Sequence, residues 1–282
     1  NTAAPPSPDL AVERLCNTCH QRPPANVEPR HLWPPKIKEM YGYLEAGGAW
    51  PKTEIPPIEQ PIAYFTQRAP EYLELPPDCS GSPPSSFPFE KHLIELKEIP
   101  NPPAVSCVKF VRLDANGPLQ LLISDMRHGV VVLWTPSQPG EPVRVIGRVP
   151  HACRTTVVDL DGDGILDVLA ADLGEFWPLD TTKGGVVWLR GRRDGQYDPH
   201  TLLDGVGRVN EVQAADFDGD GDLDLIVAMF GNFLGGSVVC LENNTEDWSE
   251  PDFEPTVIDS HTGTSDVPTA DLNQDGRPDF VA

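Results

Sequence analysis

Two cysteines and a histidine near the start of the chain have the type and spacing needed to hold a haem covalently. The segment from Cys16 to His20 reads Cys-Asn-Thr-Cys-His. In this pattern the two thiols add across the haem vinyl groups as thioethers, and the histidine ligates the iron. A thioredoxin-like redox pair would need a surrounding βαβ pattern, which this segment lacks. The motif therefore predicts one covalent haem on Cys16 and Cys19, with His20 as an axial ligand of the iron.

The second axial ligand of the iron has two candidates further along the chain. A helix is expected to begin near Pro34 and to end at Gly47, and Met40 lies on its apolar stripe. Ligation by a methionine and a histidine raises the reduction potential and suits electron transfer. His31 is the alternative and would give bis-histidine ligation with a lower potential. An open coordination position is the third reading, and the residues by themselves leave the three open.

A nine-residue acidic pattern occurs three times in the second half of the chain. Oxygen-bearing side chains at positions 1, 3, 5 and 9, with a carbonyl near position 7, suit a hard cation such as calcium. Glycine at position 6 permits the sharp turn that points the carboxylates inward. The loops are not EF-hands, because none has a glutamate at position 12. The predicted ligands are Asp159, Asp161, Asp163 and Asp167, then Asp216, Asp218, Asp220 and Asp224, then Asp271, Asn273, Asp275 and Asp279. We expect two to three calcium ions, because the third loop has an asparagine at position 3.

The segments around these loops read as β-strands. Apolar runs at residues 154–158 and 168–171 flank the first loop, and a Gly-bearing turn and another strand follow each of the first two loops. An earlier unit has the same layout but has lost most of its carboxylates, so no calcium is expected there. Each unit then contains about four short strands, as a propeller blade does. The predicted blades cover residues 104–150, 151–205, 206–260 and, in part, 261–282.

The composition of the chain indicates its domain boundaries and argues against some classes of function. Prolines crowd the first hundred residues, which predicts a haem domain at 1–74 and a Pro-rich linker at 75–103 before the β-repeats at 104–282. The formal net charge of −22 argues against binding nucleic acid or an anionic membrane. No apolar run reaches the roughly 18 residues of a membrane span.

Four cysteines remain outside the haem motif, at positions 79, 107, 153 and 240. An even number of cysteines suits an oxidising compartment. Cys107 and Cys153 occupy near-equivalent places in successive units, so a disulfide between them is one reading and two buried free thiols the other.

The acidic loops, together with the turn Phe230-Gly231-Asn232 after the second of them, resemble the integrin-like FG-GAP (VCBS) repeat family. The resemblance covers roughly residues 105–282 and implies a β-propeller, commonly of about seven blades, with calcium in the blade loops. This chain supplies three complete units and the start of a fourth, so the set of blades is incomplete in this sequence.

The segment from 16 to 70 resembles the small haem domains that precede FG-GAP repeats in some bacterial secreted proteins. In those domains a Pro-rich stretch, a tryptophan, a methionine and an aromatic helix ending in Ala-Pro follow the haem motif. The matching positions here are Trp33, Met40 and residues 62–70. The resemblance implies that Met40 is the sixth ligand.

The expected fold is a small all-α cytochrome c-like domain followed by an all-β FG-GAP propeller. The expected function is electron transfer outside the cytoplasm, in the bacterial periplasm or the medium after signal-peptide removal. In this reading the propeller docks the haem module to redox partner proteins. The alternatives are a structural or accessory subunit of a larger redox complex and a haem-linked propeller oxidoreductase. No nucleophile–base set is evident, so an electron carrier or a complex subunit is expected rather than an enzyme.

Overall fold

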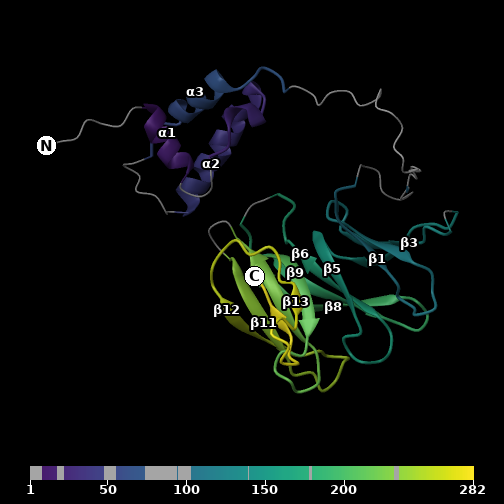
Figure 1. Ribbon diagram of the computed structural model, residues 1–282. Helices are drawn as coiled ribbons and strands as arrows, with labels where there is room; N and C mark the ends of the chain where they lie inside the picture. Colours follow the sequence, from purple (N-terminus) through teal and green to yellow (C-terminus); the bar gives the residue numbers. More distant parts are fainter. Residues whose placement is uncertain are drawn as a thin grey trace. The chain divides into compact units, whose positions relative to one another are not determined.

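In the computed structural model the chain divides into two units, Asn1–Glu90 and Lys91–Ala282 (Figure 1). The structure describes residues 8–17, 22–47, 55–73, 94, 103–138, 140–177, 180–231 and 235–282. Most of the predicted linker at 75–103 therefore lies outside the described residues. The first unit contains helices and the second contains strands. In the described part of the chain, no helix is long and apolar enough to cross a membrane.

The first unit is built from short helices around a small aromatic core. Its elements are α1 (Pro8–Cys16), η1 (Ala25–Val27), η2 (Arg30–Leu32), α2 (Trp33–Gly47) and α3 (Glu59–Arg68). The bounds of α2 confirm the helix expected from the proline start and the glycine stop. The ring of Trp33 stacks on Phe65 with 4.1 Å between centroids, and its Nε1 donates to the carbonyl oxygen of Ala25 (2.9 Å). The stacking holds α2 against α3, and the indole hydrogen bond joins α2 to η1.

Three four-stranded antiparallel sheets make up most of the second unit, and each pairs its strands in chain order. The first sheet holds β1 (Val105–Val111), β2 (Gln120–Asp125), β3 (Val130–Trp134) and β4 (Arg144–Arg148). The second holds β5 (Ala152–Val158), β6 (Asp167–Asp172), β7 (Gly184–Gly191) and β8 (Tyr197–Val206). The third holds β9 (Arg208–Ala215), β10 (Asp224–Phe230), β11 (Ser237–Asn243) and β12 (Phe253–Asp259). A two-stranded piece follows, formed by β13 (Thr269–Ala270) and β14 (Asp279–Phe280). Each full sheet therefore has the strand number and order of a propeller blade.

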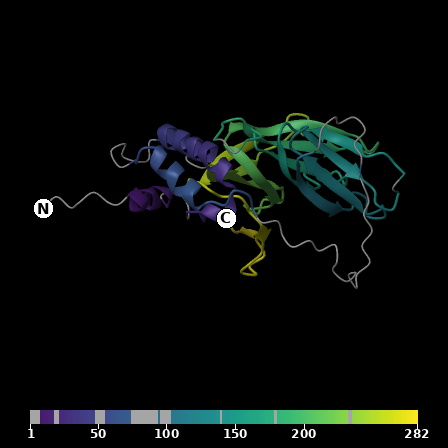
Figure 2. The ribbon, with the colours of Figure 1, turned by 90° about the horizontal axis from the view of Figure 1, so that it is seen from above.

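The sheets lie side by side in chain order, as the progression from teal through green to yellow shows (Figure 2). Their first strands contact one another through side-chain hydrogen bonds to the backbone. Ser106 Oγ of β1 donates to the carbonyl oxygen of Ala152 (2.6 Å), and Thr156 Oγ1 of β5 donates to that of Val212 in β9 (2.8 Å). Within the described residues the sheets do not close into a ring. The described part of the β unit is thus an open array of four-stranded sheets and not the expected closed propeller.

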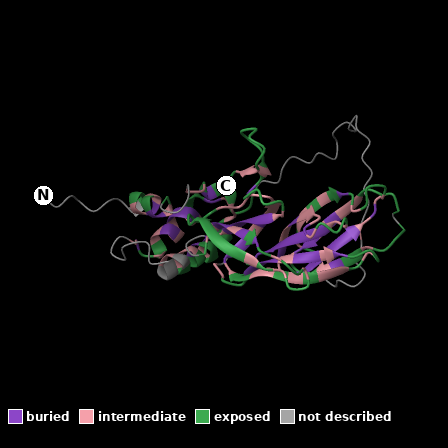
Figure 3. Ribbon diagram, turned by 90° about the horizontal axis from the view of Figure 1, so that it is seen from below, coloured by how far each residue is buried: buried purple, intermediate pink, exposed green. Residues whose placement is uncertain are grey.

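Apolar residues of the central strands form the core of this unit (Figure 3). Every residue of β6 is buried, and so are the first four residues of β3. One cluster joins the first and second sheets, and another joins the second and third around the fully buried Trp188. Valine and leucine predominate in these strands, as expected for pleated surfaces buried on both faces.

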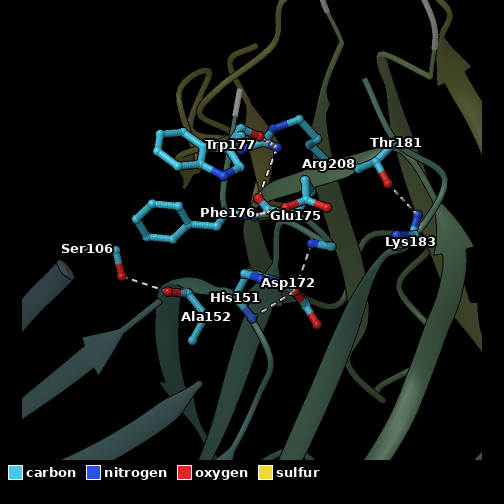
Figure 4. A network of polar contacts seen from close by, with 11 residues as sticks. Ser106, His151, Ala152, Asp172, Glu175, Phe176, Trp177, Thr181, Lys183 and Arg208 are labelled. Carbon is cyan, nitrogen blue, oxygen red and sulfur yellow. Dashed lines mark hydrogen bonds and ion pairs between the residues drawn. The ribbon is translucent and has the colours of Figure 1, made fainter. Parts of the chain in front are cut away.

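Polar contacts fix the ends of the strands that point away from the acidic loops (Figure 4). Asp172, the last residue of β6, accepts hydrogen bonds from the backbone N–H groups of His151 (3.2 Å) and Gly174 (2.8 Å). Arg208, the first residue of β9, donates to the carbonyl oxygen of Glu175 (3.0 Å). The second and third sheets are therefore joined here by hydrogen bonds as well as by the apolar core.

Candidate metal centres

Each acidic loop connects the first and second strands of its sheet. The loops lie between β5 and β6, between β9 and β10, and between β13 and β14. The aspartate at position 9 is in every case the first residue of the second strand, namely Asp167, Asp224 and Asp279. The sheet therefore fixes one carboxylate, and the turn brings the others toward it.

The same hydrogen bonds recur in all three loops and explain why the sequence folds this way. In the first loop the carboxylate of Asp159 accepts from the N–H of Gly164 (3.0 Å), and that of Asp167 accepts from the N–H of Leu160 (3.0 Å). The equivalent donor–acceptor pairs are Gly221 with Asp216 (3.1 Å), Phe217 with Asp224 (3.0 Å), Gly276 with Asp271 (3.0 Å) and Leu272 with Asp279 (2.9 Å). Aspartate side chains that bond nearby backbone N–H groups are typical turn formers, and here they preorganise the loop.

The backbone of each loop turns through the left-handed region at positions 4 and 6. Gly162 (φ 67°) and Gly164 (φ 84°) do so in the first loop, where an added Cβ would be strained. In the third loop position 4 is Gln274 (φ 63°), a side-chain-bearing residue in this region. The third loop therefore departs from the other two at this position as well as at Asn273.

In each of the first two loops, three carboxylates converge closely enough to hold one cation. Asp159, Asp161 and Asp167 each place a carboxylate oxygen within 4.8 Å of the others. Asp216, Asp218 and Asp224 do the same in the second loop. Asp163 and Asp220, which were also predicted as ligands, lie outside these groups. Among the described residues, the carboxylates of the third loop (Asp271, Asp275 and Asp279) are not brought together in this way.

Burial of Asp167 has a clear electrostatic cost. Its side chain is 1% exposed, and burial raises its pKa to about 6, with the nearby charge of Asp161 adding to the effect. Hydrogen bonds from the N–H groups of Gly191 (2.6 Å) and Leu160 (3.0 Å) act in the opposite direction. A cation between the carboxylates would favour their ionised forms.

Sequence reasoning missed one carboxylate, that of Asp222 at position 7 of the second loop. Only a backbone carbonyl was expected at this position, but Asp222 Oδ1 is buried and has no hydrogen-bond partner. Burial, followed by the charges of Asp220 and Asp224, raises the pKa of Asp222 to about 6. The sequence contains a sign of this difference, because position 7 is an aspartate in the second loop and Ile165 in the first.

The donor set of the first two loops fits a hard cation. Asp159 Oδ1 is buried without a hydrogen-bond partner, although the other oxygen of this carboxylate is bonded to Gly164. A buried carboxylate oxygen without a partner is costly unless a cation compensates it. Several aspartate oxygens on one turn match the oxygen-rich coordination that calcium prefers.

Two of the four predicted haem residues lie in the described part of the first unit. Cys16 is the last residue of α1, and burial raises the pKa of its thiol, with Arg22 acting in the opposite direction. Met40 of α2 is partly buried and packs against the same apolar cluster as Cys16, around Trp33. Cys19 and His20 lie outside the described residues. His31, the rival ligand, is exposed on η2.

The remaining cysteines show no cross-link in the described residues. Cys107, Cys153 and Cys240 are free thiols on β1, β5 and β11, and Cys79 lies outside the described part. Of the two readings of Cys107 and Cys153, the structure has the free thiols rather than the disulfide.

Comparison with known families supports a repeat class for the second unit. Residues 159–227 match the FG-GAP-like repeat family, a stretch that includes the first two acidic loops. Comparisons with curated proteins and with solved structures found no match. The chain is thus a β-rich protein that contains an FG-GAP-like repeat, a repeat typical of extracellular proteins. The family match does not extend to the helical unit.

Proposed function

We propose that this chain is an electron-transfer protein that works outside the cytoplasm. Its helical unit carries one covalent haem, and its β unit, stabilised by calcium, docks it to redox partner proteins. The observation that carries the proposal is that Cys16 and Met40 share one apolar cluster. Cys16 belongs to the pattern Cys-x-x-Cys-His, whose cysteines would anchor a c-type haem, and Met40 packs against the same cluster as Cys16, so its thioether is a candidate sixth ligand of the iron.

In this function the residues of the helical unit have different roles. Cys16 and Cys19 anchor the haem, and His20 and Met40 ligate its iron. The bound haem supplies one-electron chemistry. The apolar cluster around Trp33 and Phe65, against which Cys16 and Met40 pack, would limit the access of water to a haem held by these residues.

A pyridine haemochrome spectrum of the purified protein, before and after acid–organic extraction, tests the proposal. We expect one haem per chain that resists extraction, and loss of that haem in the double variant Cys16→Ala/Cys19→Ala. Met40→Ala should abolish the thioether band at the red end of the ferric spectrum and lower the potential, whereas His31→Ala serves as the matched control. The proposed ligand is wrong if His31→Ala changes the spectrum and Met40→Ala leaves it unchanged.

A structural or accessory subunit of a larger redox complex is the second candidate. It is favoured by the apolar side chains that the edge strand β1 leaves exposed, Val105 (49%), Val108 (55%) and Phe110 (68%). Exposed apolar patches of this kind are typical of interaction sites. The mass of the native assembly separates the two candidates, because an electron carrier would purify alone and a subunit would purify with its complex.

A further inference from the structure

An arginine from another strand places a positive charge at the first acidic loop. Arg190 of β7 forms an ion pair between its Nη2 and Asp161 Oδ2. The Asp161 side chain is 1% exposed and that of Arg190 is 29% exposed, so water screens this pair only in part. Asp161 belongs to the group of three carboxylates that could hold a cation. The guanidinium therefore already neutralises part of the negative charge that would attract calcium.

The second loop has no such counter-ion at the equivalent position. The backbone N–H of Gly191 donates to the carboxylate of Asp167, and that of Asn243 donates to the carboxylate of Asp224. Gly191 and Asn243 therefore occupy equivalent positions in the second and third sheets. The residue before each donor is Arg190 in the second sheet and Glu242 in the third. With Asp222 at position 7 as well, the second loop carries more negative charge than the first.

Arg190 also joins the first loop to the neighbouring sheet. Its Nη1 donates to the carbonyl oxygen of Trp248 (3.3 Å), in the turn between β11 and β12. Its guanidinium lies 5.4 Å from the ring centroid of Trp188, and the rings of Trp188 and Trp248 meet edge to face at 5.4 Å. A movement of Arg190 would therefore change the surroundings of both indole rings.

We infer that Arg190 acts as an internal counter-ion that makes the first acidic loop the weaker of two calcium sites and couples its filling to the packing of Trp248. The inference rests on the calcium binding included in the proposed function. Calcium entering the first loop has to displace or tolerate the guanidinium on Asp161. The second loop has no arginine at the equivalent position and carries one more negative charge, at Asp222, outside its converging group of Asp216, Asp218 and Asp224. Calcium affinity in oxygen-ligand loops depends on the charge of the ligand set.

Calorimetric titration of the full chain with calcium, followed in parallel by tryptophan fluorescence, tests this inference. We expect two classes of site in the wild type, with the fluorescence change accompanying the weaker class. Arg190→Gln should tighten the weaker class about tenfold, leave the tighter class unchanged and reduce the fluorescence change. Asp222→Asn should weaken only the tighter class.

Two controls make the result specific. Arg192→Gln removes a nearby arginine that is 52% exposed and pairs with Asp194 and Asp198, so it should change neither class. Arg190→Lys keeps the charge and should retain the weak affinity. The inference is overturned if Arg190→Gln leaves both affinities unchanged or if Arg192→Gln has the same effect. A wild type that binds no calcium at all would instead overturn the calcium sites themselves.

Discussion

Replacing Asp224 with asparagine tests whether the acidic loops are held together by their own hydrogen bonds, independently of a metal. Asp224 is 2% exposed and accepts from the N–H groups of Phe217 (3.0 Å) and Asn243 (2.9 Å), one on each side-chain oxygen. In Asp224→Asn one of these oxygens becomes an amide NH₂ that cannot accept. One charge-assisted hydrogen bond is lost, and a buried N–H is left without a partner.

The magnitude of the loss follows from those contacts. A hydrogen bond to a charged group contributes about 1.5–3 kcal/mol, and an unsatisfied buried donor costs a similar amount, so we expect about 2–3 kcal/mol lower stability. For a unit of this size, 1 kcal/mol corresponds to about 2–4 °C in Tm. The melting temperature of the β unit should therefore fall by roughly 4–12 °C.

The assay is thermal unfolding followed by circular dichroism in the presence of a strong chelator, so that bound metal does not contribute. Asp220→Asn is the matched control, because its side chain is exposed and accepts from a backbone N–H within its own loop, that of Asp222 (3.0 Å). It should cost less than about 1 kcal/mol. An equal drop for both variants, or no drop for Asp224→Asn, would refute the reasoning that the position 9 carboxylate preorganises the loop.

Three further predictions concern the β unit. Chelation should lower the Tm of the β unit in the wild type, because a ligand at a hundredfold excess over Kd stabilises the folded state by about 2.7 kcal/mol per site. Identical melting in chelator and in calcium would contradict the calcium sites. Burial would raise the pKa of Asp125, but hydrogen bonds from His128, Ala104 N–H and Arg127 N–H outweigh it and lower that pKa below the ordinary 3.8. The stability that the ionised Asp125 adds is therefore present above pH 3.8 and lost at lower pH. The difference in Tm between wild type and Asp125→Asn should be largest at pH 6 and should shrink below pH 3.8. A difference that does not depend on pH would contradict this prediction. Gly207→Ala should strongly destabilise the unit, because its Cβ would lie 1.9 Å from the carbonyl oxygen of Gly235, whereas Gly140→Ala meets nothing within 4 Å and should be close to neutral.

Local sequence patterns were enough to predict the elements and the turns of this protein. The acidic pattern with glycine at position 6 predicted three turns, and the structure contains all three with the same internal hydrogen bonds. The strand-like runs between the loops predicted about four strands per unit, as the three sheets have. Proline and glycine signals placed the helix α2. These features depend on residues close together in the sequence, where backbone propensity and turn chemistry dominate.

The sequence alone predicted one set of carboxylate ligands, and the structure groups them differently. All four aspartates of the first loop looked equivalent, but only Asp159, Asp161 and Asp167 converge. Asp163 instead accepts a hydrogen bond from the N–H of Ile165 (2.8 Å), within the same turn. Which oxygens face inward depends on side-chain directions in the folded turn, which a spacing rule does not contain.

Only the tertiary structure decided the electrostatic surroundings of these loops. Pairing of β6 with β7 carries Arg190 to the side of Asp161, and packing of the third sheet brings Trp248 against Arg190. The sequence therefore determined that this chain contains acidic turns between strands. Contacts between residues far apart in the chain determined which of those turns carries a counter-ion, because charge interactions depend on distance in space rather than on distance in sequence.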